Sequence, residues 1–211
     1  MKVTALIPAR LSSTRFDRKL LMDLCGKSII LRTYESVVET GLFHSVYVVT
    51  EDKEIYNEIV NAGGNSILSK NKHESGSDRI AEACVSIDSD AFVNIQGDEP
   101  FIDSSSLNKL VFELNNSDHV SLMINISDIN EINDPNNVKV IVDSENYALY
   151  FSRSVIPFCR DVNTAEVTYY KHIGVYGFTK QALVNFSKLP PSKLELVEKI
   201  EAIRIVENGS R

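Results

Sequence analysis

VTALIPARLSSTRFDRK, residues 3–19, joins a continuous apolar run to a strongly basic loop. The apolar run at 3–9 is typical of a strand that is covered on both faces of a sheet. The segment IPARLSSTRFDRK at 7–19 concentrates basic side chains, although the whole chain has a formal net charge of −7. These basic side chains are Arg10, Arg15, Arg18 and Lys19. We therefore expect the loop after the first strand to bind a negatively charged group.

Composition limits the classes of protein to consider. With 211 residues, of which 43% are hydrophobic, the chain can bury one core and is predicted to be a single domain. A pI near 5.2 argues against nucleic-acid and anionic-membrane partners. We find neither a signal-peptide pattern nor an apolar run of membrane-spanning length. Cys25, Cys84 and Cys159 are scattered without a CxxC motif, which is typical of reduced thiols in a cytoplasmic protein.

The first half of the chain alternates strand-like and helix-like segments. Helices are predicted at 28–41, with Gly41 ending the first one, and then at 51–64 and 75–87. Strands are predicted at 45–50, 65–69 and 90–95. This alternation predicts an α/β fold with a mainly parallel, doubly wound (Rossmann-like) nucleotide-binding sheet.

The alternation ends near residue 118. Strand runs follow at 120–126, 138–153 and 171–179, and DSEN at 143–146 is a turn signal within the second run, so we expect a hairpin. A helix is predicted at 192–204, with Pro190 and Pro191 marking its start. We therefore divide the single domain 1–211 into a core at 1–118, an added antiparallel hairpin lobe at 119–180 and a C-terminal helix and strand at 181–211.

A loop at the carboxyl end of the first strand of such a sheet is the usual ligand crevice. Arginine forms forked hydrogen bonds to phosphate and lysine supplies a mobile point charge, so a triphosphate would explain the basic loop. The alternative is a solvated loop held by surface ion pairs of little individual strength. The chain has no GxxxxGK[ST] after this strand and no GxGxxG, which disfavours a P-loop kinase and a dehydrogenase.

A second cluster, NIQGDEP at 94–100, follows another predicted core strand. Strand-end acids beside a basic pocket indicate a magnesium ligand, because Mg²⁺ prefers oxygen donors and shares substrate phosphates. Asp98 is the candidate ligand and Glu99 is the reserve. The alternative is a turn in which Asp98 caps a local backbone N–H.

The motifs IPARLSSTR…K, ESGSDRIAEA, NIQGDEP, NVKVIVD…YALYFSR…IP and HIGVYGF occur in this order from residue 3 to about residue 206. Together they resemble the 3-deoxy-manno-octulosonate (Kdo) cytidylyltransferases, also called CMP-Kdo synthetases. QGDEP separates this family from the sialate cytidylyltransferases. The resemblance implies that CTP and Kdo react to give CMP-Kdo and pyrophosphate, with Mg²⁺ as cofactor, in lipopolysaccharide biosynthesis. It also implies a CTP-binding core at 1–118 and a lobe at 119–180 that binds the sugar acid.

The resemblance assigns roles to residues of this chain. Arg10, Lys19 and Asp98 would act in catalysis, and Asp98 would hold the metal. The nucleotide would be bound by Pro8, Ala9, Arg10, Ser13, Arg15, Lys19 and Arg79. The sugar acid would be bound by Gln96, Arg153, His172, Tyr176 and Glu201. Arg153 also makes chemical sense independently of the resemblance, since a carboxylate substrate favours a forked cation.

The predicted chemistry is in-line attack of the anomeric 2-hydroxyl on the α-phosphorus of CTP, and no residue needs to form a covalent intermediate. His172 lies in an apolar strand run, which favours a structural or sugar-contacting histidine over a general base. Tyr176 lies four residues further on and shares a face of the strand with His172. This pair is typical of a sugar-binding wall, with ordinary strand packing as the alternative.

The chain departs from the family pattern in three places. RFDRK at 15–19 replaces Arg-Leu-Pro-Gly-Lys, so that Asp17 could pair with Arg15 or Arg18. Glu201-Ala202 replaces Glu-Gln, which we expect to alter selectivity for the sugar acid. The family continues into a GVDTPEDL segment, whose aspartate is a second magnesium ligand, whereas this sequence stops at RIVENGSR. A shortened chain, a different metal site and a weakened enzyme are the three explanations.

Other functions remain open at this point. One is the same reaction on 8-amino-Kdo or on another sugar acid such as a sialic acid. Another is a catalytically weak protein that binds CTP or a sugar acid. The resemblance also implies a homodimer, with the hairpin at 138–160 as the contact, and apolar edge strands there are consistent with pairing.

Overall fold

The computed structural model describes residues 1–11, 17–71, 73, 75–160 and 167–210. Its residues form two compact units. The first unit comprises Met1–Val120 with Val175–Lys188, and the second comprises Ser121–Gly174 with Leu189–Arg211. The sequence predicts a single domain whose lobe begins at 119; in the structure Val175–Lys188 belongs with the first unit.

The first unit is built on a parallel sheet centred on β1 (Val3–Ala9), which is buried at every position. On one side β1 pairs in parallel with β2 (Ser45–Thr50), which in turn pairs in parallel with β3 (Ser66–Leu68). On the other side β1 pairs in parallel with β4 (Ala91–Asn94), and β4 pairs in antiparallel fashion with β8 (Tyr169–Thr179). The strand order β3-β2-β1-β4-β8 confirms the mainly parallel sheet.

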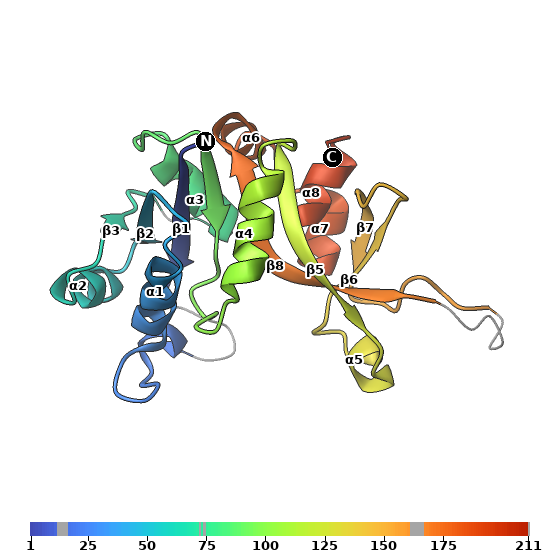
Figure 1. The fold of residues 1–211 in the computed structure, drawn as a ribbon, viewed down its shortest axis with the longest axis horizontal. Helices are drawn as coiled ribbons and strands as arrows, with labels where there is room; N and C mark the ends of the chain where they lie inside the picture. The colour runs from blue at the N-terminus through green and yellow to red at the C-terminus, as the bar shows by residue number, and fades with distance from the viewer. Residues whose placement is uncertain (12–16, 72, 74, 161–166, 211) are drawn as a thin grey trace. The chain divides into compact units, whose positions relative to one another are not determined.

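Helices cover both faces of this sheet (Figure 1). One face carries α1 (Ile29–Glu39), α2 (Lys53–Asn61) and α4 (Ser104–Glu113), and the other carries α3 (Gly76–Cys84) and α6 (Lys180–Phe186). This arrangement confirms the doubly wound architecture. No described helix is both long and apolar enough to cross a membrane.

Local chemistry explains where the first helix begins and ends. The Ser28 hydroxyl accepts a hydrogen bond from the backbone N–H of Leu31, which satisfies a donor of the first turn. Gly41 follows the helix with φ +64°, a conformation that glycine adopts without steric cost. A short 3-10 helix, η1 (Lys19–Leu21), precedes α1.

The second unit contains an antiparallel hairpin. Its strands are β6 (Lys139–Val142) and β7 (Ala148–Ser152), and Asn146 in the connecting turn has φ +66°. The sequence prediction of a hairpin with its turn at 143–146 is confirmed. β6 also pairs in antiparallel fashion with β8, and β8 pairs with β5 (His119–Ile126). The helix α5 (Ile129–Asn133) lies between β5 and β6 in sequence.

The C-terminal segment differs from its prediction. The single helix expected at 192–204 is two helices, α7 (Lys193–Glu198) and α8 (Ala202–Glu207), separated at Lys199, whose φ is +57°. A straight helix would spread its buried residues over more than one face, and the break allows all of them to be buried. Between residues 181 and 210 the structure has helices and turns and no strand, so the predicted C-terminal strand is wrong.

A buried ion pair holds α7 to α8. The Arg204 guanidinium donates to the two carboxylate oxygens of Glu195 at 2.8 and 2.6 Å. Arg204 is 2% exposed and Glu195 is 6% exposed. Glu195 also closes a capping box with Ser192 at the start of α7. The pair therefore sets the position of both helices within the second unit.

We predict that Arg204→Met destabilises the chain by about 3–5 kcal/mol, because the Glu195 carboxylate would remain buried without its partner. The free energy of unfolding in urea measures this effect. Lys188→Met is the matched control, since Lys188 is an exposed cation of similar length. An Arg204→Met variant as stable as the Lys188→Met variant would show that the ion pair does not hold the helices together.

Candidate active site

The loops that follow β1 and β4 approach each other closely at the carboxyl edge of the parallel sheet. A Cβ placed on Gly97, after β4, would lie 3.2 Å from the Pro8 carbonyl oxygen, and one on Gly76 would lie 3.1 Å from the Pro8 ring. Pro8 and Ala9 are the last two residues of β1 and are buried. The absence of side chains at Gly76 and Gly97 therefore lets three segments meet at the end of β1.

Charges of opposite sign meet at this edge. The Lys19 ammonium contacts the Asp98 carboxylate at 2.5 Å, and their side chains are 44% and 39% exposed. Arg10 is exposed directly after β1. Gln96, on the strand side of the same loop, is half-buried. The structure thus brings together Lys19 and Asp98, which the sequence places in separate clusters.

The base of the basic loop is closed by contacts with the start of α2. The Leu11 N–H donates to the Asp52 carboxylate at 2.7 Å, and the Arg18 N–H donates to the Leu11 carbonyl at 3.0 Å. The Arg18 guanidinium pairs with Glu54, and this contact raises the pKa of Arg18 and lowers the pKa of Glu54. The predicted residues Ser13 and Arg15 lie outside the described residues.

Arg18 occupies the place where the resembling family carries glycine, and its φ of +57° explains that preference. A non-glycine residue is strained in this region by about 1–2 kcal/mol. From the sequence, Asp17 could pair with Arg15 or Arg18. The structure pairs the Arg18 guanidinium with Glu54, and Arg15 lies outside the described residues.

Arg79 lies on α3 and is 3% exposed. Its Nη2 atom is 2.7 Å from a carboxylate oxygen of Glu51, which follows β2. A buried cation needs such a partner, because transfer of an isolated charge out of water is costly. The role of Arg79 in nucleotide binding stays a prediction, and the structure shows the carboxylate that holds the guanidinium.

The donor chemistry at the carboxyl edge fits a magnesium ion. Mg²⁺ is commonly held by one or two carboxylates together with substrate phosphates and water. Asp98 supplies an accessible carboxylate beside a cation that suits phosphate. The described residues hold no group of three or more His, Cys, Asp or Glu side chains that could bind a metal without substrate.

Arg153, in the second unit, is held at four of its atoms. Its N–H donates to the Glu198 carboxylate at 2.9 Å, and its Nε donates to the Glu198 carbonyl at 2.7 Å. Its Nη1 donates to the Pro135 carbonyl at 3.0 Å, and its own carbonyl accepts from the Lys139 ammonium at 2.8 Å. The predicted carboxylate-binding arginine is therefore firmly positioned.

His172 is 7% exposed, and burial lowers its pKa to about 4. Its ring packs edge-on against Phe151. The neutral, buried imidazole agrees with the structural interpretation and argues against a general base. Tyr176 also lies on β8, in the first unit, where its ring packs near Phe178. Glu201 is half-buried at the start of α8.

Several carboxylates and one lysine that organise the site were missed by sequence reasoning. They are Glu51, Asp52, Glu54, Glu198 and Lys139. The first three follow directly after β2, and acids at this strand end were a signal that could have been used. Glu198 and Lys139 act through contacts with the backbone of distant segments, for which a single sequence gives no signal.

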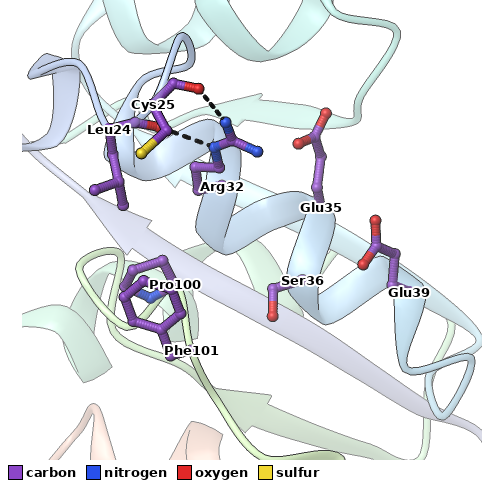
Figure 2. Close-up of a pocket in the computed structure, with 8 residues that line it drawn as sticks. All are labelled: Leu24, Cys25, Arg32, Glu35, Ser36, Glu39, Pro100 and Phe101. Carbon is purple, nitrogen blue, oxygen red and sulfur yellow. Dashed lines mark hydrogen bonds between the residues drawn. The ribbon is translucent and has the colours of Figure 1, made fainter.

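A hollow of about 370 Å³ lies on the first unit (Figure 2). α1 contributes Arg32, Glu35, Ser36 and Glu39, and Pro100 and Phe101 lie opposite. Arg32 donates hydrogen bonds to the carbonyls of Leu24 and Cys25, which fixes the turn before α1. None of the predicted site residues lines this hollow.

Comparison with known proteins defines the class. Residues 4–211 match the family described as Cytidylyltransferase. The chain is 52% identical to a 3-deoxy-manno-octulosonate cytidylyltransferase of Flavobacterium johnsoniae and 53% identical to one of Christiangramia forsetii. These matches cover all of this chain and 88% and 86% of the two relatives. The chain therefore belongs to the cytidylyltransferase family, and the resemblance seen in the sequence is confirmed.

One solved structure supports the same assignment, and a second supports the fold. A CMP:2-keto-3-deoxy-manno-octonic acid synthetase complexed with CTP superposes with a TM-score of 0.93 at 35% identity, over 100% of this chain and 87% of that one. A 4-diphosphocytidyl-2C-methyl-D-erythritol synthase from Anaerococcus prevotii gives a TM-score of 0.61 at 14% identity, over 99% and 84%. The second protein shares the fold alone.

We predict that His172 makes stability fall with acidification. Its folded pKa of about 4 lies below the usual 6.5, so between these values the unfolded chain binds a proton that the folded chain does not. The contribution of His172 to the free energy of unfolding is therefore constant well above pH 6.5 and is lost as the pH falls toward 4. From pH 7 to pH 5, wild type should lose about 1–2 kcal/mol more than His172→Asn.

Urea unfolding at the two pH values measures this difference. His44→Asn is the control, because the His44 side chain is exposed. Equal losses in wild type and His172→Asn would contradict the assignment of a buried neutral imidazole.

Proposed function

We propose that the chain transfers the cytidylyl group of CTP to Kdo, giving CMP-Kdo and pyrophosphate for lipopolysaccharide biosynthesis. Relatives named for this activity match the chain along its whole length at 52–53% identity. The structural observation that carries the proposal is the contact between Lys19 and Asp98. It brings together a cation that suits phosphate and a carboxylate that suits a metal ion, at the edge where β1 and β4 end.

In the proposed reaction the 2-hydroxyl of the sugar acid attacks the α-phosphorus in line and pyrophosphate leaves. Arg10 and Lys19 neutralise the triphosphate and the charge that develops on the leaving group. Arg79, held by Glu51, binds the nucleotide from α3. Catalysis is then largely orientation and charge neutralisation, and no side chain needs to form a covalent bond with substrate.

We further propose that the enzyme depends on Mg²⁺ and that Asp98 holds the ion. Bound Mg²⁺ would withdraw charge from the phosphate oxygens of CTP. Lys19 neutralises Asp98, and this contact keeps together two of the groups that would face CTP. Arrival of the triphosphate gives the Lys19 ammonium an alternative anionic partner.

Arg153 is the proposed partner of the sugar-acid carboxylate. Among the described residues, its guanidinium donates through Nε and through one N–H of Nη1. The edge formed by Nη1 and Nη2 can then make a two-pronged contact with a carboxylate. Ala202, where the resembling family has glutamine, is 4% exposed at the start of α8. A methyl group there offers no hydrogen bond to a sugar hydroxyl, so 8-amino-Kdo and sialic acids stay alternative substrates.

We also propose a cytoplasmic homodimer, in which the hairpin segment at 138–160 contacts a second copy. Two large apolar side chains of this segment reach solvent: Leu149 is 53% exposed and Phe158 is 85% exposed. A second copy would remove them from water, which favours association.

We predict that Lys19→Ala and Asp98→Ala each lower turnover at least tenfold, because each removes one transition-state contact of about 1.4 kcal/mol. Pyrophosphate release with CTP, Mg²⁺ and Kdo measures the effect. Lys27→Ala is a matched control: the Lys27–Glu35 pair has a 2.6 Å contact and similar exposure, but lies outside the proposed site. Folded variants of Lys19 and Asp98 that keep the wild-type rate would contradict the assignment.

The choice of sugar acid is tested by comparing Kdo, 8-amino-Kdo and N-acetylneuraminate in the same assay. We expect Kdo to give the highest kcat/KM and the reaction to stop when EDTA removes Mg²⁺. Faster turnover of another acid would correct the substrate. Binding of CTP without turnover of any acid would instead support the catalytically weak binding protein.

A further inference from the structure

Lys139 is a fully buried cation in the second unit. It lies on β6 and is 0% exposed. Its ammonium donates to three backbone carbonyls, those of Asp134 at 3.0 Å, Asn137 at 2.6 Å and Arg153 at 2.8 Å. An ammonium group has three N–H donors, so the three carbonyls match its capacity. Burial lowers the pKa of Lys139 below its ordinary value.

These carbonyls come from both sides of the hairpin. Asp134 and Asn137 precede β6, whereas Arg153 follows β7. β6 and β7 pair so that Lys139 lies opposite Ser152, the residue before Arg153. The ammonium therefore ties the start of β6 to the backbone that carries Arg153.

A second set of contacts acts on Arg153 from α7. One Glu198 carboxylate oxygen accepts from the Ser152 hydroxyl at 2.6 Å, and the other accepts from the Arg153 N–H at 2.9 Å. The Glu198 carbonyl accepts from Arg153 Nε. Pro135, which accepts from Nη1, lies between two residues whose carbonyls Lys139 binds. Lys139 thus holds both the backbone of Arg153 and the segment that orients its guanidinium.

We propose that Lys139 is a positioning residue that aligns Arg153 for the carboxylate of the sugar acid. This inference rests on the proposed function and assigns a role to a side chain whose hydrogen bonds, among the described residues, go to backbone carbonyls. Charge-assisted hydrogen bonds hold geometry more strongly than neutral ones. Removal of the ammonium releases three carbonyls and allows Arg153 and the segment 134–137 to shift. Loss of alignment weakens binding of the sugar acid and leaves binding of CTP unchanged.

The test is a double-mutant cycle with Lys139→Met and Arg153→Ala, read as separate KM values for sugar acid and CTP. Lys139→Met should raise the KM for the sugar acid at least tenfold and change the KM for CTP less than twofold. In the Arg153→Ala background, Lys139→Met should change the KM for the sugar acid less than twofold. Lys171→Met is the matched control, because Lys171 lies opposite Lys139 on β8 but is only half-buried.

A general structural role predicts a different result. If Lys139 only stabilises the unit, its replacement should change the KM for the sugar acid and the KM for CTP by similar factors, or should change kcat. Alternatively, the change in the KM for the sugar acid should be the same in the wild-type and Arg153→Ala backgrounds. Either pattern overturns the inference. Should Lys139→Met fail to fold, Lys139→Gln keeps two N–H donors without the charge, and the same cycle decides with that variant.

Failure of the proposed function is distinguishable from failure of this inference. Absence of turnover by wild type with Kdo contradicts the proposed function, and the cycle is then read from the dissociation constant of Kdo by calorimetry. A Kdo affinity that Lys139→Met leaves unchanged, or absence of Kdo binding to wild type, overturns the inference as well.

Discussion

The structure of the first unit depends on the complete burial of β1 between two parallel neighbours. All seven residues of this strand are buried, and β2 and β4 pair with it on either side. Such a strand cannot shift its register without exposing apolar surface, so its carboxyl end is a fixed point. The basic loop begins at that end, and the loop after β4 passes beside it. A Cβ on Gly97 in that loop would lie 3.2 Å from the Pro8 carbonyl oxygen. The position of the charged groups follows from the position of the strand.

Lys19 in the first unit and Lys139 in the second unit differ in exposure and in the groups that bind their ammonium. At the edge of the parallel sheet the Lys19–Asp98 and Arg18–Glu54 ion pairs remain accessible to solvent. Accessible pairs are weak, so an incoming triphosphate can displace them at little cost. In the second unit Lys139 has no exposed surface and its ammonium is bound by three backbone carbonyls, whereas the buried Arg204 pairs with the Glu195 carboxylate. The three carbonyls around the Lys139 ammonium fix the start of β6 against the backbone of Arg153.

Sequence periodicity predicts most of the architecture because strands and helices of the first unit follow local rules. α1 begins after Ser28 and ends before Gly41, and the turn that contains Asn146 joins the two strands of the hairpin, as side-chain chemistry predicts. The C-terminal segment was predicted incorrectly because tertiary burial competes with local preference. Two faces of the segment 192–204 must be buried, and the left-handed conformation of Lys199 is what permits this. No local signal separates that outcome from a straight helix.

The sequence by itself determined the fold class, the basic loop that follows β1 and the family to which the chain belongs. These depend on short-range patterns and on ordered motifs that are visible in one dimension. Only the tertiary structure decided which charges meet. The pairing of Lys19 with Asp98 joins residues 79 positions apart, and that of Arg18 with Glu54 joins residues 36 apart. The cage around Lys139 uses backbone carbonyls, which every residue possesses, so the identities of the residues that supply them carry no signal.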